Sequence, residues 1–447
     1  MLSDTIVALA TPSGRAALAL IRISGEAACA VAARAIPAFD PTNVRRATLA
    51  SVVNPDSGEL LDRAVYVFYR APNSFNGQDT VEVTTHGGLL VPTTVLAAFL
   101  AAGARLAEPG EFTRRAVLNG KMDLLQAEAI VDLVEATAPA QRQAALAQMN
   151  RGLSNRITAL RSGIIELEAL LAYDIDFPEE DDGPVSPERI TRTVGDLLAD
   201  IDRLLATAAD GERVREGALA VIAGEPNVGK SSLFNALLGS ERAIVTEIEG
   251  TTRDAIEAPI TCRGYPFRLV DTAGLRSSDD RIEKLGIEVS KRYVADADVV
   301  LLCVEAGKPL DQNEEEFATS VRDRLIVIRT KTDLHPGFSG AAAEVAVSAE
   351  SLLGIDELRQ ALAKLAFAGV SYAGDVSPLL NRERHRAALV RARDELEQFV
   401  AARRDGLEPV VCAIHLGAAV GALEEIVGVV TTEDVLDELF SSFCVGK

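Results

Sequence analysis

The chain is short of positive charge and of aromatic side chains. Its 45 lysines and arginines face 66 aspartates and glutamates, which gives a net charge of −21, and only 4% of its residues are aromatic, none of them tryptophan. Because non-specific nucleic-acid binding is driven by cationic surface, a chain of this charge repels a polyanion as a whole. Any contact with RNA therefore needs a basic partner subunit or a local patch, for which the candidates are Arg45–Arg46, Arg114–Arg115 and residues 382–393.

Cysteines and histidines are also few. Five cysteines without CxxC spacing argue against a disulfide scaffold or a structural zinc site, and the four histidines are scattered. We find no apolar run of membrane-spanning length and no leader pattern in the first residues. With 48% hydrophobic and 25% charged residues over 447 positions, the sequence predicts a cytoplasmic globular protein of two to four domains that makes no use of a membrane.

The most specific motif lies near the middle of the chain. Residues 224–231 read GEPNVGKS, which fits the phosphate-binding P-loop pattern, between a predicted strand at 218–223 and a predicted helix at 232–238. Such a loop points backbone N–H groups at phosphate oxygens, and the helix N-terminus adds partial positive charge. Lys230 is therefore predicted to reach the β- and γ-phosphates, and the Ser231 hydroxyl to bind Mg²⁺.

Three later segments follow predicted strands in the order that a guanine-nucleotide site requires. In DTAG at 271–274, the first carboxylate is expected to hold the Mg²⁺ shell through water. In TKTD at 330–333, Asp333 is expected to accept hydrogen bonds from guanine and Lys331 to lie along the base, which Ser348–Ala349 would back. Because parallel α/β sheets bind ligands at the carboxyl ends of strands, the ordered set predicts a Ras-like P-loop G domain with a mainly parallel sheet.

Two positions depart from common GTPase patterns. Thr330 stands where an Asn is usual, and its shorter side chain predicts weaker nucleotide affinity with guanine preference kept through Asp333. Leu275 stands where Ras-type enzymes carry the glutamine that orients water, so another group must do this. Residues 250–254 form a predicted switch loop, with Thr252 as a second Mg²⁺ ligand. The candidate GTP-binding residues are Asn227, Val228, Gly229, Lys230, Ser231, Ser232, Thr246, Glu247, Ile248, Glu249, Gly250, Thr251, Thr252, Asp271, Thr272, Ala273, Gly274, Thr330, Lys331, Thr332, Asp333, Ser348 and Ala349.

The rest of the chain flanks this G domain. Its first part alternates strand-like and helix-like segments, which predicts a small α/β domain. Apolar residues three or four apart from Leu146 to Leu171 predict one long amphipathic helix, and helical patterns return after the G domain. The predicted fold is multidomain, α/β plus all-α: an N-terminal α/β domain at 1–118, a helical-bundle domain at 119–216 and 375–447, and a G domain inserted in it at 217–374.

Cys444 lies close to the C-terminus, in the run FCVGK at 443–447. Near the basic Lys447 its thiolate is favoured, and a thiolate is the nucleophilic form. The residues alone leave two interpretations open, a catalytic cysteine and a plain tail.

Together these features resemble the bacterial MnmE (TrmE) family of tRNA modification GTPases, over essentially the full length. The resemblance rests on the G-motif set and on four further runs: PGEFTRRA at 109–116, LNGKMDL at 118–124, DFPEE at 176–180 and CVGK at 444–447. Val445 and Thr330 depart from the commonest family residues, which are Ile and Asn.

The resemblance implies a GTP-hydrolysing subunit of a tRNA-modifying complex. The family works with the flavoprotein MnmG, which would carry the FAD, to build a carboxymethylaminomethyl or aminomethyl group on C5 of the wobble uridine. A 5-formyl- or methylene-tetrahydrofolate would donate the one-carbon unit. The N-terminal domain would form a homodimer and bind the folate, whose carboxylates and pterin edge suit basic and acidic side chains, with Cys444 near the one-carbon unit. The implied folate contacts are Arg22, Glu82, Lys121 and Lys447.

The resemblance also implies how hydrolysis proceeds. The G domains of two chains would dimerise across the nucleotides and bind K⁺, which stabilises charge developing on the phosphates. The implied K⁺ ligands are Asn227, Thr246, Ile248 and Thr251. Glu283, twelve residues after Asp271, matches the water-orienting glutamate of the family, and Lys230 and Cys444 complete the catalytic candidates.

Two other functions share part of this pattern. A regulatory ribosome-assembly GTPase without covalent RNA chemistry would share the G motifs, but it would more often carry a basic RNA-binding appendage, and none is evident. A folate-dependent one-carbon transferase with incidental GTP binding would fit the N-terminal half and leave the complete G-motif set without a role.

Overall fold

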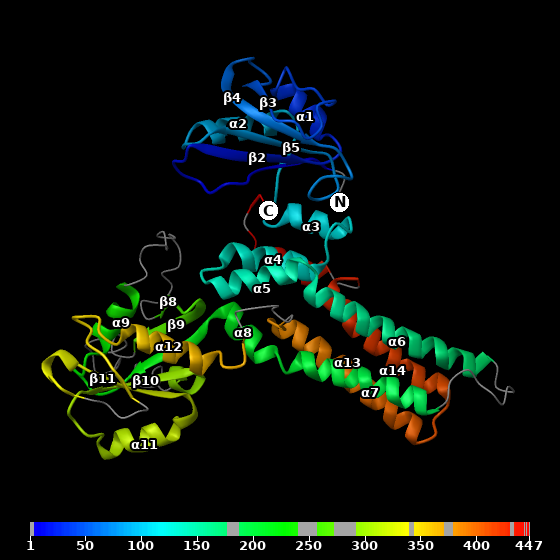
Figure 1. Ribbon diagram of the computed structural model, residues 1–447. Helices are drawn as coiled ribbons and strands as arrows, with labels where there is room; N and C mark the ends of the chain where they lie inside the picture. Colours follow the sequence, from blue (N-terminus) through cyan, green and yellow to red (C-terminus); the bar gives the residue numbers. More distant parts are fainter. Residues whose placement is uncertain are drawn as a thin grey trace, which may run out of the picture. The chain divides into compact units, whose positions relative to one another are not determined.

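The computed structural model describes residues 4–176, 187–239, 257–271, 292–338, 344–370, 379–429, 433–441, 443 and 445–446 (Figure 1). The chain divides into two compact units. The first joins Met1–Val131 to Glu424–Lys447, so that the two ends of the chain belong to one unit, and the second is Asp132–Leu423.

The first unit contains a sheet of six strands, largely antiparallel, in the order β3-β4-β5-β2-β1-β6. Helices α1 and α2 pack on it through a core that includes Ile21, Phe68 and Phe99. The strand-like segments of the sequence in this part are residues 5–10, 16–23, 64–69 and 80–85. The sequence analysis therefore missed β3, an edge strand with exposed residues, and β6, a strand of two residues. The bounds are β1 Ile6–Leu9, β2 Leu18–Ser24, α1 Ala28–Ala35, β3 Thr48–Val53, β4 Leu60–Tyr69, β5 Thr80–His86, α2 Val91–Ala101, β6 Arg105–Leu106, α3 Glu111–Leu118 and α15 Glu433–Ser441.

The second unit contains a helical part, in which α6, α7, α13 and α14 run side by side (Figure 1). The predicted single helix from Leu146 to Leu171 is wrong. The chain turns at Asn150–Arg151, where Arg151 has φ +64°, and Leu146 is 42% exposed instead of lying in the seam. The bounds are α4 Leu124–Glu135, which begins in the first unit, α5 Pro139–Met149, α6 Gly152–Asp176, α7 Pro187–Leu205, α8 Ala208–Glu216, α13 Glu383–Arg404 and α14 Pro409–Val427, which ends in the first unit.

Helix α14 corrects the expectation that no segment reaches membrane-spanning length. Over an 18-residue window its mean hydropathy is 1.8, which makes it long and apolar enough to span a membrane by length and composition alone. Most of its apolar character comes from valine, isoleucine and leucine, but His415, Glu424 and Glu425 interrupt the run, so the sequence reading missed it. A core helix passes the same test, and one face of α14 holds the buried side chains of Leu416, Leu423 and Ile426.

The other part of the second unit is built on a six-stranded sheet in the order β12-β11-β10-β7-β9-β8, parallel except for the edge pair β8–β9. Alternate residues of β7 enter cores on opposite faces, Ile222 with α9 and α12 and Val221 with α11. This burial on both faces explains the continuous apolar run that predicts β7. The bounds are β7 Ala218–Ala223, α9 Lys230–Gly239, β8 Glu257–Cys262, β9 Tyr265–Asp271, β10 Val299–Glu305, α11 Gln312–Ser320, β11 Leu325–Thr330, β12 Glu344–Ala346 and α12 Ile355–Ala366.

A buried ion network fastens α3 to the N-terminal strand region. The Arg115 side chain is 1% exposed, and its Nη2 lies 2.7 Å from Glu111 Oε1 and 2.6 Å from Asp4 Oδ1. Arg105 Nη2 also lies 2.7 Å from Glu111 Oε1. Burial raises the pKa of Glu111, but hydrogen bonds from Arg105 and Arg115 outweigh it, so its pKa lies below the ordinary 4.5. The network therefore stabilises the fold at neutral pH, and this contribution is lost as the pH falls through the lowered pKa.

We expect Glu111→Ala to destabilise the first unit by about 3 kcal/mol, because it removes one of the two carboxylates that pair with the buried Arg115 guanidinium. Hydrogen exchange of the β1 and β2 amides, measured in the full chain at pH 7, reports this local free energy. The control is Glu59→Ala, which removes an exposed side chain. Equal protection of the two variants would contradict a stabilising role for the network.

Candidate functional site

The P-loop lies between β7 and α9. At one of its glycines, Gly224, the neighbouring backbone leaves no room for a side chain. Gly224 has φ +135°, and a Cβ there would lie 2.4 Å from the Cys303 carbonyl oxygen on β10. Gly229 and Asn227 also have positive φ, +103° and +62°. The loop therefore curves tightly over the carboxyl end of the sheet, the geometry in which its N–H groups can converge on phosphate oxygens.

Lys230 and Ser231 occupy the first turn of α9. The Lys230 side chain is 8% exposed, and its Nζ donates to the carbonyls of Gly224 and Glu225 at 3.0 and 2.6 Å. The Ser231 hydroxyl donates to Asp271 Oδ2 at 2.8 Å, at the end of β9. A hydroxyl and a carboxylate are the oxygen ligands that Mg²⁺ prefers, so this pair fits the predicted magnesium site.

Thr330 ties β11 to the P-loop. Its hydroxyl donates to the Val228 carbonyl, and its side chain lies 3.6 Å from the position of a Cβ on Gly229. The threonine thus braces the P-loop from the neighbouring strand.

The remaining predicted base-binding residues gather beside Thr330. The Thr332 N–H donates to the Val347 carbonyl at 3.3 Å, which joins this loop to the end of β12. Ser348 is buried there, and Asp333 is exposed. Lys331 has the left-handed conformation, with φ +57°.

Glu305, the last residue of β10, is a site residue that the sequence interpretation missed. Its Oε2 lies 3.3 Å from Lys331 Nζ and 2.8 Å from Lys308 Nζ. Hydrogen bonds from Lys308 and Lys331 hold the pKa of Glu305 below its ordinary value. Its place at a strand end beside the P-loop strand was the signal that could have found it.

Cys303, also on β10, is fully buried under the P-loop, and burial raises the pKa of its thiol to about 12. Such a thiol is protonated at neutral pH and acts as a packing residue.

Several predicted site residues lie outside the described part of the chain. They are Thr246, Glu247, Ile248, Glu249, Gly250, Thr251, Thr252, Thr272, Ala273, Gly274, Glu283, Cys444 and Lys447.

A second cluster forms on the sheet of the first unit, around Arg22 of β2. Arg22 pairs with Glu82 of β5, with Nε and Nη2 at 3.0 and 2.8 Å from Glu82 Oε1. Its guanidinium carbon lies 5.5 Å from the ring centre of Phe75 and 5.6 Å from that of Phe112. A cation, a carboxylate and two aromatic rings lie together here and can bind a ligand that has carboxylates and a flat ring system, and the two rings were missed from the sequence.

The C-terminal segment reaches the same cluster. Val445 forms an antiparallel bridge with Pro109, and the Gly446 carbonyl accepts from Arg22 Nη1 at 3.3 Å. A Cβ on Gly446 would lie 2.7 Å from the Leu9 carbonyl oxygen, so the chain passes close against β1. The segment beside Cys444 is therefore held against the first unit.

Lys121 contacts the loop that carries Phe75. Its Nζ donates to the Pro72 carbonyl at 2.9 Å, and Asn119 Nδ2 donates to the Asn76 carbonyl at 2.7 Å. The structure therefore brings Arg22 and Glu82 together and links Lys121 to them through residues 72–76.

The arginines of the candidate RNA-binding patches are largely paired. Arg114 Nη1 lies 2.7 Å from Asp437, and Arg382 Nη2 lies 2.6 Å from Asp132. Arg386 pairs with Glu383, and Arg393 with Asp394. Pairing of this kind reduces the net positive field that a polyanion would meet.

Together the loop, its lysine and the strand-end residues define a P-loop nucleotide-binding protein with a Ras-like G domain. A family profile described as "MnmE helical domain" matches residues 124–444, and one described as "GTP-binding protein TrmE N-terminus" matches residues 5–121. The chain belongs to the MnmE family, as its sequence motifs predicted.

Individual relatives match this chain over its full length. A protein of Moorella thermoacetica named tRNA modification GTPase MnmE is 42% identical over 464 aligned positions, covering 100% of both chains. A protein of the same name from Aquifex aeolicus is 40% identical, covering 99% of this chain and 100% of its own. Among solved structures, the G domain of the FeoB iron transporter of T. maritima is 26% identical, covering 33% of this chain and 98% of its own, with a TM-score of 0.24.

We expect Thr330→Val to weaken GDP and GTP binding about tenfold, because the Val228 carbonyl loses a buried hydrogen bond. Thr330→Asn should bind nucleotide more tightly than the natural chain, and both variants should keep the preference for guanine over adenine. Displacement of a fluorescent GDP analogue measures all three affinities.

The control for this pair is Thr319→Val, since the Thr319 hydroxyl donates only to Glu315 within α11. Unchanged affinity in Thr330→Val would mean that the hydroxyl does not brace the P-loop.

Proposed function

We propose that this chain hydrolyses GTP as a subunit of a complex that modifies C5 of the wobble uridine in tRNA. The observation that carries the proposal is the full-length relationship to proteins named tRNA modification GTPase MnmE. The P-loop contacts of Lys230 and Ser231 support the GTPase part. The alternative of a ribosome-assembly GTPase shares these contacts but leaves the cluster around Arg22 without a role.

The chemistry of GTP hydrolysis follows from the P-loop geometry. Lys230 would neutralise the β- and γ-phosphates, and Ser231 with Asp271 would hold Mg²⁺, directly and through water. Asn227 is exposed on the P-loop with a positive φ, a position from which it can join a K⁺ site. Thr246, Ile248 and Thr251 as the other K⁺ ligands, Thr252 on Mg²⁺, and Glu283 as the water-orienting residue are proposed on the family resemblance alone.

The one-carbon unit would come from a 5-formyl- or methylene-tetrahydrofolate at the Arg22–Glu82 cluster. Arg22 offers donors to a carboxylate of the folate, and the Glu82 carboxylate accepts from the pterin edge. Phe75 and Phe112 offer rings for stacking. Lys121 and Lys447 complete the proposed folate contacts. The hydrogen bond from Arg22 to the Gly446 carbonyl supports a role for Cys444 beside the one-carbon unit.

The proposed partners follow from the same family resemblance and from charge. The chain would act in the cytoplasm as a homodimer, with G domains that associate across the nucleotides, together with the flavoprotein MnmG, which would carry the FAD. Because the candidate basic patches are largely paired, we propose that a basic surface of MnmG supplies much of the contact with tRNA. The proposed domains are residues 1–118, 119–216 with 375–447, and 217–374.

We expect steady-state GTP turnover to rise strongly in K⁺ relative to Na⁺ at matched ionic strength, because a cation held between associated G domains stabilises charge developing on the phosphates. ATP turnover should stay at background in both salts. Phosphate release in the two salts measures the effect. Slow turnover that is indifferent to the cation would favour the ribosome-assembly alternative.

The matched control for this experiment is Glu283→Ala. It should lose the K⁺-stimulated turnover while keeping GTP affinity, since the residue is proposed to orient water and not to bind nucleotide. Equal loss of binding and turnover would remove that role.

We expect Arg22→Gln and Glu82→Gln each to weaken binding of 5-formyl-tetrahydrofolate by about tenfold or more, because each removes a charge-assisted hydrogen bond. Isothermal titration of the full chain measures the affinity, and GTP turnover should not change. The control is Arg63→Gln, an exposed arginine on β4. Unaltered folate affinity in both cluster variants would place the folate elsewhere.

A further inference from the structure

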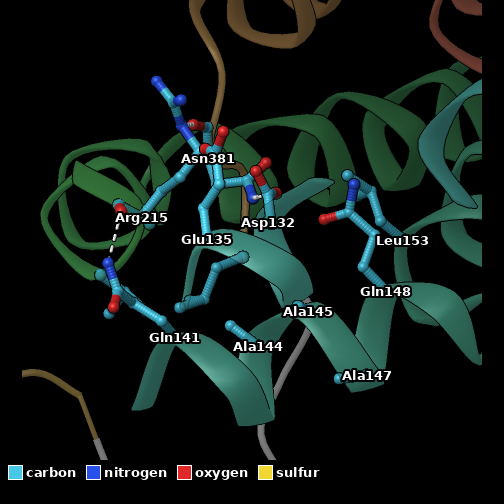
Figure 2. Close-up of a pocket in the computed structure, with 13 residues that line it drawn as sticks. Asp132, Glu135, Gln141, Ala144, Ala145, Ala147, Gln148, Leu153, Arg215 and Asn381 are labelled. Atoms are coloured by element: carbon cyan, nitrogen blue, oxygen red, sulfur yellow. Dashed lines mark hydrogen bonds between the residues drawn. The ribbon is translucent and has the colours of Figure 1, made fainter. Parts of the chain in front are cut away.

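The second unit contains a cavity of about 150 Å³ that takes no part in the proposed function (Figure 2). It lies between the end of α4, helix α5, helix α8 and residues 379–381. Cavities of about this volume hold ligands of roughly four to six non-hydrogen atoms. The chemistry of the lining decides what kind of ligand fits.

One side of the cavity is apolar. Three alanines of α5, Ala144, Ala145 and Ala147, line it (Figure 2). Val214 of α8 lines it too. Small side chains leave the space beside the helix open, so this wall suits a short aliphatic group.

Three hydrogen-bond donors on the polar side are engaged within the protein. Gln141 Nε2 donates to the Arg215 carbonyl at 2.8 Å, drawn as a dashed line in Figure 2. Arg215 Nε donates to the Asn381 carbonyl at 2.7 Å. Asn381 Nδ2 donates to Asp132 at 3.2 Å.

The acceptors on the polar side are in excess. The Asn381 side chain belongs to a residue that is 8% exposed, and its Oδ1 has no hydrogen-bond partner among the described residues. Glu135 also lines the cavity, three residues along α4 from Asp132, whose carboxylate accepts from Asn381 Nδ2 and Arg382 Nη2. A buried acceptor without a partner costs about 1–3 kcal/mol, and the Glu135 carboxylate adds negative charge, so a ligand that brings donors and a positive charge is favoured.

We propose that this cavity is a binding site for a small organic amine in its ammonium form. The ammonium donates to Asn381 Oδ1 and to the Glu135 carboxylate, and a short aliphatic body lies against Ala144 and Ala147. The site stands at the entry and exit of the G domain, since α8 leads into β7 and residues 379–381 lead into α13. It is independent of the folate and nucleotide sites.

The test uses the full chain labelled with ¹³C at alanine methyl groups, titrated with n-propylammonium. The methyl signals of Ala144, Ala145 and Ala147 should shift with a single saturable isotherm, whereas n-propanol and propionate should leave them unchanged. Equal shifts with n-propanol would overturn the proposal, because they would show an apolar cavity without charge recognition.

Two variants separate the site from general attraction of cations to an acidic chain. Glu135→Gln, an exposed position, and Ala147→Leu, which fills the cavity, should each weaken propylammonium binding about tenfold. The control Glu357→Gln removes an exposed carboxylate of α12 and should bind as the natural chain does. Unchanged affinity in both cavity variants, or an equal loss in the control, would overturn the proposal.

Discussion

The close approach of the P-loop to the ends of β10 and β11 is the constraint on which the nucleotide site depends. Gly224 lies so near the Cys303 carbonyl that no side chain fits there, and Thr330 holds the Val228 carbonyl from the next strand. This packing curves the loop and places Lys230 over its carbonyls. Burial keeps the Cys303 thiol beneath the P-loop protonated.

In the first unit, segments near both ends of the chain contact the same sheet. The buried Arg115 fastens α3 to Asp4, and Pro109, just before α3, pairs with Val445. The same arrangement brings the Gly446 carbonyl to Arg22, between two aromatic rings. A small ligand at this cluster would therefore contact residues from opposite ends of the sequence.

In this acidic chain, many of the arginines are paired with carboxylates of the same chain. Many arginines that could have met RNA are engaged with carboxylates, as in the Arg382–Asp132 and Arg114–Asp437 pairs. They fasten helices and loops together within their own units. An acidic chain organised in this way is consistent with the proposal above that a partner subunit supplies the cationic surface for tRNA.

By itself, the sequence determined the fold class, the P-loop and the strand-end motifs, because each rests on local pattern: a buried strand, a glycine-rich turn and a helix start in order. Local pattern did not show the break at Arg151, since the apolar spacing continues across the turn, nor the edge strand β3, which has exposed residues. Only the tertiary structure decided that Thr330 braces the P-loop, that Glu305 holds Lys331, and that Phe75, Phe112 and Gly446 surround Arg22. These contacts join residues far apart in sequence, and no periodicity records which strand ends and chain ends will meet.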